Sequence, residues 1–162
     1  MPIITSEIVY RLSGGAANAS ALASLGGAKS SSVVPAGLFD DVTSAESSAG
    51  DIEYRCIYVH NANGTLAMRN AVVYIQTNTT GNRIAIGVGS SAINGTEQTV
   101  ADENTAPTSV TFSQPTNKAG GLALGNIPAG QHRAVWLRRT IAAATAASND
   151  TYTLRVECDT AA

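Results

Sequence analysis

The sequence predicts an all-β protein that folds as a single antiparallel β-sandwich with an extended N-terminal arm. Two observations lead to this prediction. From residue 51 onward, short runs rich in β-branched and aromatic residues alternate with Asn/Gly/Thr turns, which is typical of all-β domains. Before residue 51, Ala, Gly and Ser dominate, and these side chains bury little surface. The length of 162 residues suits one domain with a core of its own.

Seven runs between Asp51 and Asp159 have the length and residue types of strands. They are residues 51–61, 69–78, 83–90, a hairpin over 92–100 that turns at Asn94-Gly95, 109–115, 132–141 and 150–159. The last run is the most regular, because its apolar and polar residues alternate strictly. This number of strands predicts a sandwich over residues 51–162, of the immunoglobulin-like or jelly-roll type, and leaves the strand order open.

Residues 1–50 are expected to form an arm that is largely extended or irregular. It opens with a possible strand at residues 3–12 and continues through "LSGGAANASALASLGGAKSSS", residues 12–32, which carries one charge. Residues 18–27 have the composition of a short helix that stops at a Gly-Gly pair, and residues 44–51 that of one helical turn.

The arm contains few residues that could hold it in place. Small side chains and glycines let a backbone lie flat against another surface, where main-chain hydrogen bonds and a few apolar anchors give it order. The anchors in this segment are Ile3, Ile4, Val9, Leu22 and Leu25. We therefore expect Ile3, Ile4, Leu22 and Leu25 to contact a protein partner.

A second candidate binding element is "QHRAVWLRRT", which surrounds the only tryptophan of the chain with arginines. Trp and Arg are enriched at interface hot spots, because an aromatic ring buries a large area and a guanidinium pairs with carboxylates in a planar fork. This pattern nominates Arg133, Trp136 and Arg139 as protein-binding residues. The alternative is that Trp136 belongs to the core while Arg138 lies on the same strand face near an edge.

The sequence has no pattern that indicates catalysis or a cofactor. His60 and His132 lie near strand ends, where a hydrogen-bonded surface imidazole is the ordinary state. The Gly-rich stretches lack the context of a phosphate-binding loop, and no GxSxG turn occurs. Cys56 and Cys158 are too far apart for a CxxC metal pattern, and both are expected to be reduced core residues. We expect no catalytic residues and no cofactor, so the protein is not predicted to be an enzyme.

An acidic group lies around the predicted boundary between arm and sandwich. It comprises Asp40, Asp41, Glu46, Asp51 and Glu53. Such carboxylates can bind a hard cation such as calcium, but their spacing matches no calcium-loop motif. Charged residues beside a linker are usually solvated, so no metal site is predicted.

The overall charge and hydropathy pattern limit the classes of partner. The formal net charge of −2 gives no global attraction to nucleic acid or to an anionic membrane surface. No apolar run reaches the length of a membrane-spanning helix, and residues 1–11 do not resemble a signal peptide. The expectation is a soluble protein made in the cytoplasm, with no nucleic acid or membrane partner.

Several long stretches carry a resemblance to a known family. They are "LSGGAANASALASLGGAKSS", "LFDDVTSAESSAGDIEYRCIYVHN", "INGTEQTVADENTAPTSVTF" and "IPAGQHRAVWLRRTI" with "NDTYTLRVECDT". Together they resemble small virion structural proteins of tailed bacteriophages, several of which are capsid decoration, or cement, proteins. The resemblance covers most of the chain, and its motifs are turn and strand residues rather than catalytic signatures.

This resemblance implies a β-sandwich that binds the outer surface of an assembled capsid and stabilises it. The implied partners are the major capsid protein and neighbouring copies of the chain, often as a homotrimer, with an arm that reaches across capsid subunits. The implied location is the virion. A tail or baseplate component is the second interpretation, and a bacterial surface adhesion module is the third.

Overall fold

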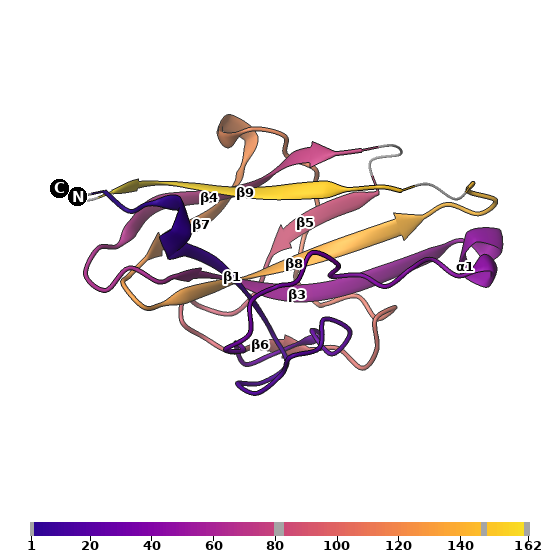
Figure 1. The fold of residues 1–162 in the computed structure, drawn as a ribbon, viewed down its shortest axis with the longest axis horizontal. Helices are drawn as coiled ribbons and strands as arrows, with labels where there is room; N and C mark the ends of the chain where they lie inside the picture. Colours follow the sequence, from indigo (N-terminus) through magenta and orange to yellow (C-terminus); the bar gives the residue numbers. More distant parts are fainter. Residues whose placement is uncertain (1, 80–82, 147–148, 161–162) are drawn as a thin grey trace.

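The computed structural model describes residues 2–79, 83–146 and 149–160, and it confirms an all-β, antiparallel architecture. One sheet has the order β1 (Ile8–Leu12), β3 (Asp51–Asn61), β8 (His132–Ile141) and β5 (Ile84–Val88). The second has the order β7 (Leu122–Ile127), β4 (Met68–Asn78) and β9 (Tyr152–Thr160). Figure 1 shows the long strands of both sheets running along the same axis of the molecule.

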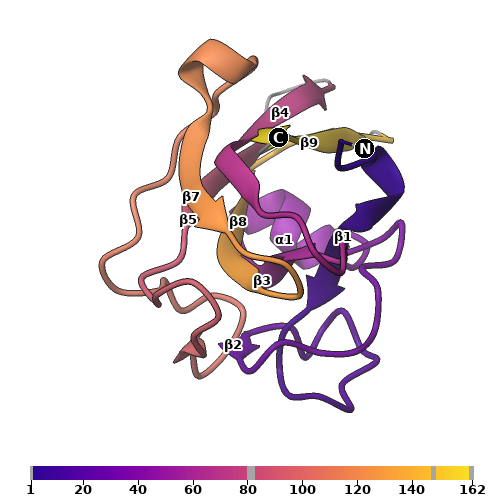
Figure 2. The same ribbon diagram turned by 90° about the vertical axis from the view of Figure 1, so that its left-hand side faces the viewer.

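Short elements complete the fold. β2 (Gly26–Gly27) pairs with β6 (Glu97–Thr99) in a separate two-stranded ribbon. α1 (Ser44–Ala49) precedes β3, while the 3-10 turns η1 (Thr5–Glu7) and η2 (Lys118–Gly120) precede β1 and β7. In Figure 2 the three-stranded sheet lies above the four-stranded sheet, and β2 lies below both.

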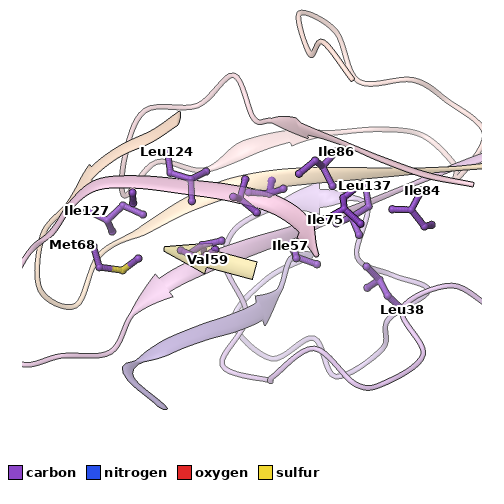
Figure 3. Close-up of a cluster of buried hydrophobic side chains, with 14 of the residues drawn as sticks. Leu38, Ile57, Val59, Met68, Ile75, Ile84, Ile86, Leu124, Ile127 and Leu137 are labelled. Atoms are coloured by element: carbon purple, nitrogen blue, oxygen red, sulfur yellow. The ribbon is translucent and has the colours of Figure 1, made fainter. Parts of the chain in front are cut away.

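The main core fills the space between the two large sheets (Figure 3). Alternate residues of each strand point into it, because successive side chains of a strand face opposite sides of the sheet. Ile57 and Val59 of β3 and Leu137 of β8 meet Ile75 of β4 and Leu124 of β7 in this layer. On β9 the predicted alternation is confirmed, since its apolar residues pack against the same core.

A second core lies on the other face of the four-stranded sheet. Tyr54, Cys56 and Tyr58 of β3 and Trp136 of β8 form it with Val100. Partly buried apolar residues from two loops cover these side chains, namely Leu25, Val110 and Phe112. The sheet is therefore apolar on both faces, which explains why β3 is buried along most of its length.

The extended arm expected for residues 1–50 is not what the structure shows. β1 is an antiparallel neighbour of β3, with Leu12 opposite Ile57, and Leu12 is fully buried. The amide of Val34 donates to the carbonyl of Tyr10 in β1, so the chain around residue 34 runs back along the outer edge of β1. The N-terminal segment thus adds a strand to the sandwich domain.

The small-residue stretch, residues 12–32, also lies on the domain and forms no helix at residues 18–27. The hydroxyls of Ser13 and Ser24 donate to the carbonyl of Cys56 at 2.8 and 2.9 Å. An added Cβ at Gly26 would lie 1.8 Å from the carbonyl oxygen of Gln98. The stretch is made of small residues because its backbone touches the backbone of its neighbours.

Other elements differ from the sequence-based expectation. Residues 109–115 form no strand and make a single bridge, between Ile86 and Ser113, whereas β7 was not expected. The short helix at residues 44–49 is present, capped by Thr43.

Both cysteines are free; Cys56 is buried, and Cys158 is half-buried because β9 lies at the edge of its sheet.

Candidate interaction residues and a buried charge cluster

Trp136 is fully buried, so its nomination as an interface anchor is wrong for the folded chain. It lies opposite Cys56 in the β3–β8 register and belongs to the second core. Arg138, on the same face of β8, stacks its guanidinium over the ring of Phe112 at 5.2 Å. This arrangement matches the alternative interpretation of the sequence, with tryptophan in the core and arginine beside it.

Arg133 and Arg139 are half-buried and bind within the chain. The guanidinium of Arg133 donates to the carbonyls of Ser91 and Gly89. Arg139 donates through Nε to the carboxylate of Glu53. Neither side chain is a free arginine ready to pair with an acidic partner.

The apolar residues nominated in the N-terminal segment divide into two pairs. Ile3 and Leu25 are half-buried, the first against the main core and the second against the second core. Ile4 and Leu22 are 56% and 52% exposed. The structure therefore leaves Ile4 and Leu22 available to a partner.

A cluster of charged side chains lies at the end of the sandwich near α1, and we call it the charge cluster. It consists of Asp40, Glu53, Arg55, Glu103 and Arg139. Glu53 and Arg55 have no exposed surface, and they share the core-facing side of β3 with Ile57 and Val59. Buried charges need partners, and here carboxylates and guanidiniums alternate.

The geometry of the charge cluster follows from the strand register and two loops. Glu53 and Arg139 are directly opposite in β3 and β8 and form an ion pair. Arg55 contacts Glu103 at 2.5 Å and Asp40 at 3.5 Å. The ring of Phe39 lies over the guanidiniums of Arg55 and Arg139, with distances of 5.4 and 4.9 Å to its centroid.

Sequence reasoning missed the charge cluster. It assigned Glu53 to a solvated acidic group and gave no role to Arg55. A signal was present, because both residues alternate in phase with the core residues Ile57 and Val59. Charged residues on the buried face of a strand indicate an internal ion pair, since lone buried charges are too costly.

A pocket of about 730 Å³ opens beside the charge cluster. Its walls include residues 36–44, part of α1, the end of β4, the start of β5, the end of β8, and the start of β9 with described residues of the loop before it. Leu38, Ile84 and Tyr152 supply apolar surface, while Asp40 and Arg139 supply charge. The pocket is large enough for a small ligand or for the side chains of a partner.

The two histidines do not form a catalytic arrangement in the described residues. Nε2 of His60 contacts the carbonyl of Gly130 at 3.2 Å, and Nε2 of His132 contacts that of Gly95 at 3.3 Å. Burial lowers the pKa of both imidazoles below the usual value. Within the ranges described, neither has a hydrogen bond to a nucleophile or a carboxylate, which a general base would need.

No helix in the described residues combines the length and apolar character needed to cross a membrane. Comparison with protein-family models, with curated proteins and with solved structures gave no match.

Proposed function

We propose that this protein is a structural component of a tailed-phage particle that binds the outer surface of the assembled capsid and stabilises it. The proposal rests on the resemblance of long stretches of the chain to decoration proteins and on the all-β fold that the resemblance implied. The partner is the major capsid protein. On the capsid surface, each copy of the chain also contacts neighbouring copies, with which it forms a homotrimer.

The observation that carries the proposal is the placement of exposed apolar side chains. Three of the five large apolar residues exposed in the described chain, Ile4, Leu22 and Val33, lie in the first 33 residues. A partner that covers them gains the free energy of removing apolar surface from water. We therefore propose that the N-terminal segment, which lies on the surface of the domain, is the part of the chain that contacts the capsid.

A modest contact is enough for this role. Affinity at an interface of ordinary size depends on its best-packed residues rather than on its area. When many copies bind one shell, the contributions of many weak contacts add, and a trimer gains avidity in addition. A stabilising surface protein therefore needs no deep binding site.

The test is the number of copies in purified virions of the phage that encodes the chain. We expect about one copy per copy of the major capsid protein, measured by quantitative mass spectrometry. A few tens of copies per particle would overturn the capsid assignment and place the protein in the tail or baseplate. Its absence from the particle would overturn both assignments.

A binding experiment locates the contact. Capsids that lack the protein are mixed with the purified chain, and co-sedimentation is measured. We expect Leu22→Asp and Val33→Asp to weaken binding about tenfold or more, because each places a charge in an apolar contact. Ile52→Asp is the matched control, since Ile52 is 43% exposed at the start of β3. Equal binding by all three variants would contradict the proposed surface.

A further inference from the structure

We infer that Glu46, Asp51 and Glu53 form a calcium-binding site where α1 joins β3. This inference is independent of the capsid proposal. One carboxylate oxygen from each residue lies within 4.8 Å of the others. Calcium binds oxygen at 2.3–2.6 Å, so two ligands on opposite sides of one ion are about 4.8 Å apart. The three oxygens are therefore close enough to share an ion.

Each of the three carboxylates has an oxygen available for a cation. Glu46 uses Oε2 to accept from the amide of Thr43 at 2.6 Å, and Asp51 uses Oδ1 to accept from the side chain of Asn104 at 2.7 Å. Glu53 uses Oε2 for Arg139. The second oxygen of each accepts no hydrogen bond from the described part of the chain.

The second oxygen of Glu53 points independently to a ligand. The side chain has no exposed surface, and its Oε1 is buried without a hydrogen-bond partner among the described residues. An unpaired carboxylate oxygen removed from water costs free energy. A cation shared with Glu46 and Asp51 supplies the missing partner, and Glu53 is the innermost ligand of the group.

The charge balance favours this group over the adjacent one. Asp40, Glu53 and Glu103 also approach within 4.8 Å of one another, but Arg55 and Arg139 already pair with them. The two groups together contain five carboxylates and two guanidiniums, so their formal charge is −3; these residues are Asp40, Glu46, Asp51, Glu53, Glu103, Arg55 and Arg139. The uncompensated charges are on the side of Glu46 and Asp51, where one divalent cation reduces the excess to −1.

Local structure holds the ligands in place before an ion binds. Glu46 closes the capping box of α1 with Thr43, which directs its side chain to the start of the helix. Gly50 ends the helix with φ of +81°, and an added Cβ would lie 3.0 Å from backbone atoms of Ile141 and Ala143. This turn lets β3 begin at Asp51, directly after the helix.

The ligand set suits calcium better than magnesium. Calcium accepts six to eight oxygens in a flexible arrangement, including carboxylates that bind through both oxygens. Magnesium requires near-ideal octahedral geometry at 2.0–2.1 Å and retains its water. The three carboxylates come from α1, from the start of β3 and from a buried position in β3. They leave coordination positions for water and do not fix the octahedral geometry that magnesium requires.

The test is a calcium titration of the full chain after treatment with EDTA and removal of the chelator. We expect one ion per chain by isothermal titration calorimetry. The melting temperature is expected to rise by about 5 to 10 °C when free calcium is 100-fold above its Kd. No heat of binding and no change in melting temperature up to 10 mM CaCl2 would overturn the inference.

Matched variants locate the site. Glu46→Gln keeps the capping box, and Asp51→Asn keeps the acceptor for Asn104, so both preserve the local hydrogen bonds. We expect each to lower calcium affinity about tenfold or more, because each removes a charged ligand. Asp41→Asn, at an exposed neighbouring carboxylate outside the group, is expected to bind calcium as the wild type does. Unchanged affinity in Glu46→Gln and Asp51→Asn, or an equal response to magnesium, would contradict a calcium site here.

Discussion

The hydroxyl of Tyr58 donates a hydrogen bond to the backbone carbonyl of Gly27 at 2.6 Å. The same hydroxyl accepts from the backbone amide of Glu97 at 2.9 Å. One side chain of the central strand β3 therefore connects both strands of the β2–β6 ribbon to the sandwich. This contact explains how a segment with few large apolar residues is ordered, because its backbone polar groups bind the domain.

Removing this hydroxyl tests how much the contact contributes. We expect Tyr58→Phe to lower the free energy of unfolding by about 1 to 3 kcal/mol, since the amide of the buried Glu97 loses its partner. Urea unfolding measures the change. Tyr74→Phe is the control, because its hydroxyl pairs at 2.5 Å with a half-exposed carboxylate, Glu157, that water can solvate. Equal losses in the two variants would contradict the connecting role of Tyr58.

The close approach of the ribbon backbones leads to a second prediction. Gly26 has a φ of +98°, and its Cβ position is occupied by the carbonyl of Gln98. We expect Gly26→Ala to destabilise the protein by about 3 kcal/mol or more, from backbone strain and steric overlap together. Thermal unfolding gives the measurement.

Gly15→Ala separates the two causes. Gly15 also has a positive φ, +106°, but no atom lies within 4 Å of its Cβ position. Only backbone strain remains, and we expect a loss of about 1 to 2 kcal/mol. If Gly26→Ala is no more harmful than Gly15→Ala, the backbones of β2 and β6 are not in contact.

The charge cluster predicts a large effect from a single arginine. Arg55→Ala leaves Glu103 without its ion-pair partner, leaves Asp40 paired with Arg139 alone, and opens a cavity where a fully buried side chain lay. We expect the free energy of unfolding to fall by about 2 to 5 kcal/mol, as for other large buried side chains truncated to alanine. Urea unfolding at neutral pH measures it.

Arg155→Ala is the matched surface control. Arg155 pairs with Glu157 at 3.3 Å, and its side chain is 50% exposed. Exposed pairs contribute little, so we expect a loss below about 1 kcal/mol. Similar losses in the two arginine variants would show that the buried network does not stabilise the fold more than a surface pair does.

Glu97 predicts a defined acid sensitivity. Burial acts to raise its pKa, but hydrogen bonds from the backbone of Ser91 and the side chains of Ser90 and Gln98 outweigh burial and lower the pKa to about 2. A depressed pKa in the folded state contributes stability that is present above about pH 4.5. That stability is lost as the pH falls from about 4.5 toward 2, because the unfolded chain binds the proton more readily.

The measurement is urea unfolding at pH 6 and pH 3. We expect the wild type to lose on the order of 2 kcal/mol more than Glu97→Gln between these two pH values, because the variant has no proton to bind at this position. The comparison cancels the contribution of the other carboxylates. Parallel losses in the two proteins would contradict the low pKa of Glu97.

Local pattern in the sequence determined much of the secondary structure. The strand at residues 51–61 matches β3 because its residue types favour strands and turn residues flank it. Alternation alone identified the core face of β9. The helical turn expected from the composition of residues 44–51 is present as α1, Ser44–Ala49, and the structure adds the capping box of Thr43 and Glu46 that begins it. Each of these features depends on residues within a few positions of one another.

Tertiary structure decided the parts that depend on distant residues. Glu53 and Arg139 become an ion pair only through the β3–β8 register, which joins positions 86 residues apart. Trp136 is buried because two loops cover the outer face of its sheet, and no local pattern distinguishes a covered face from a free one. The N-terminal segment was expected to be an arm because its own side chains bury little surface. It is ordered on the domain because its backbone groups and serine hydroxyls bind β3, and such partners are set by the folded chain alone.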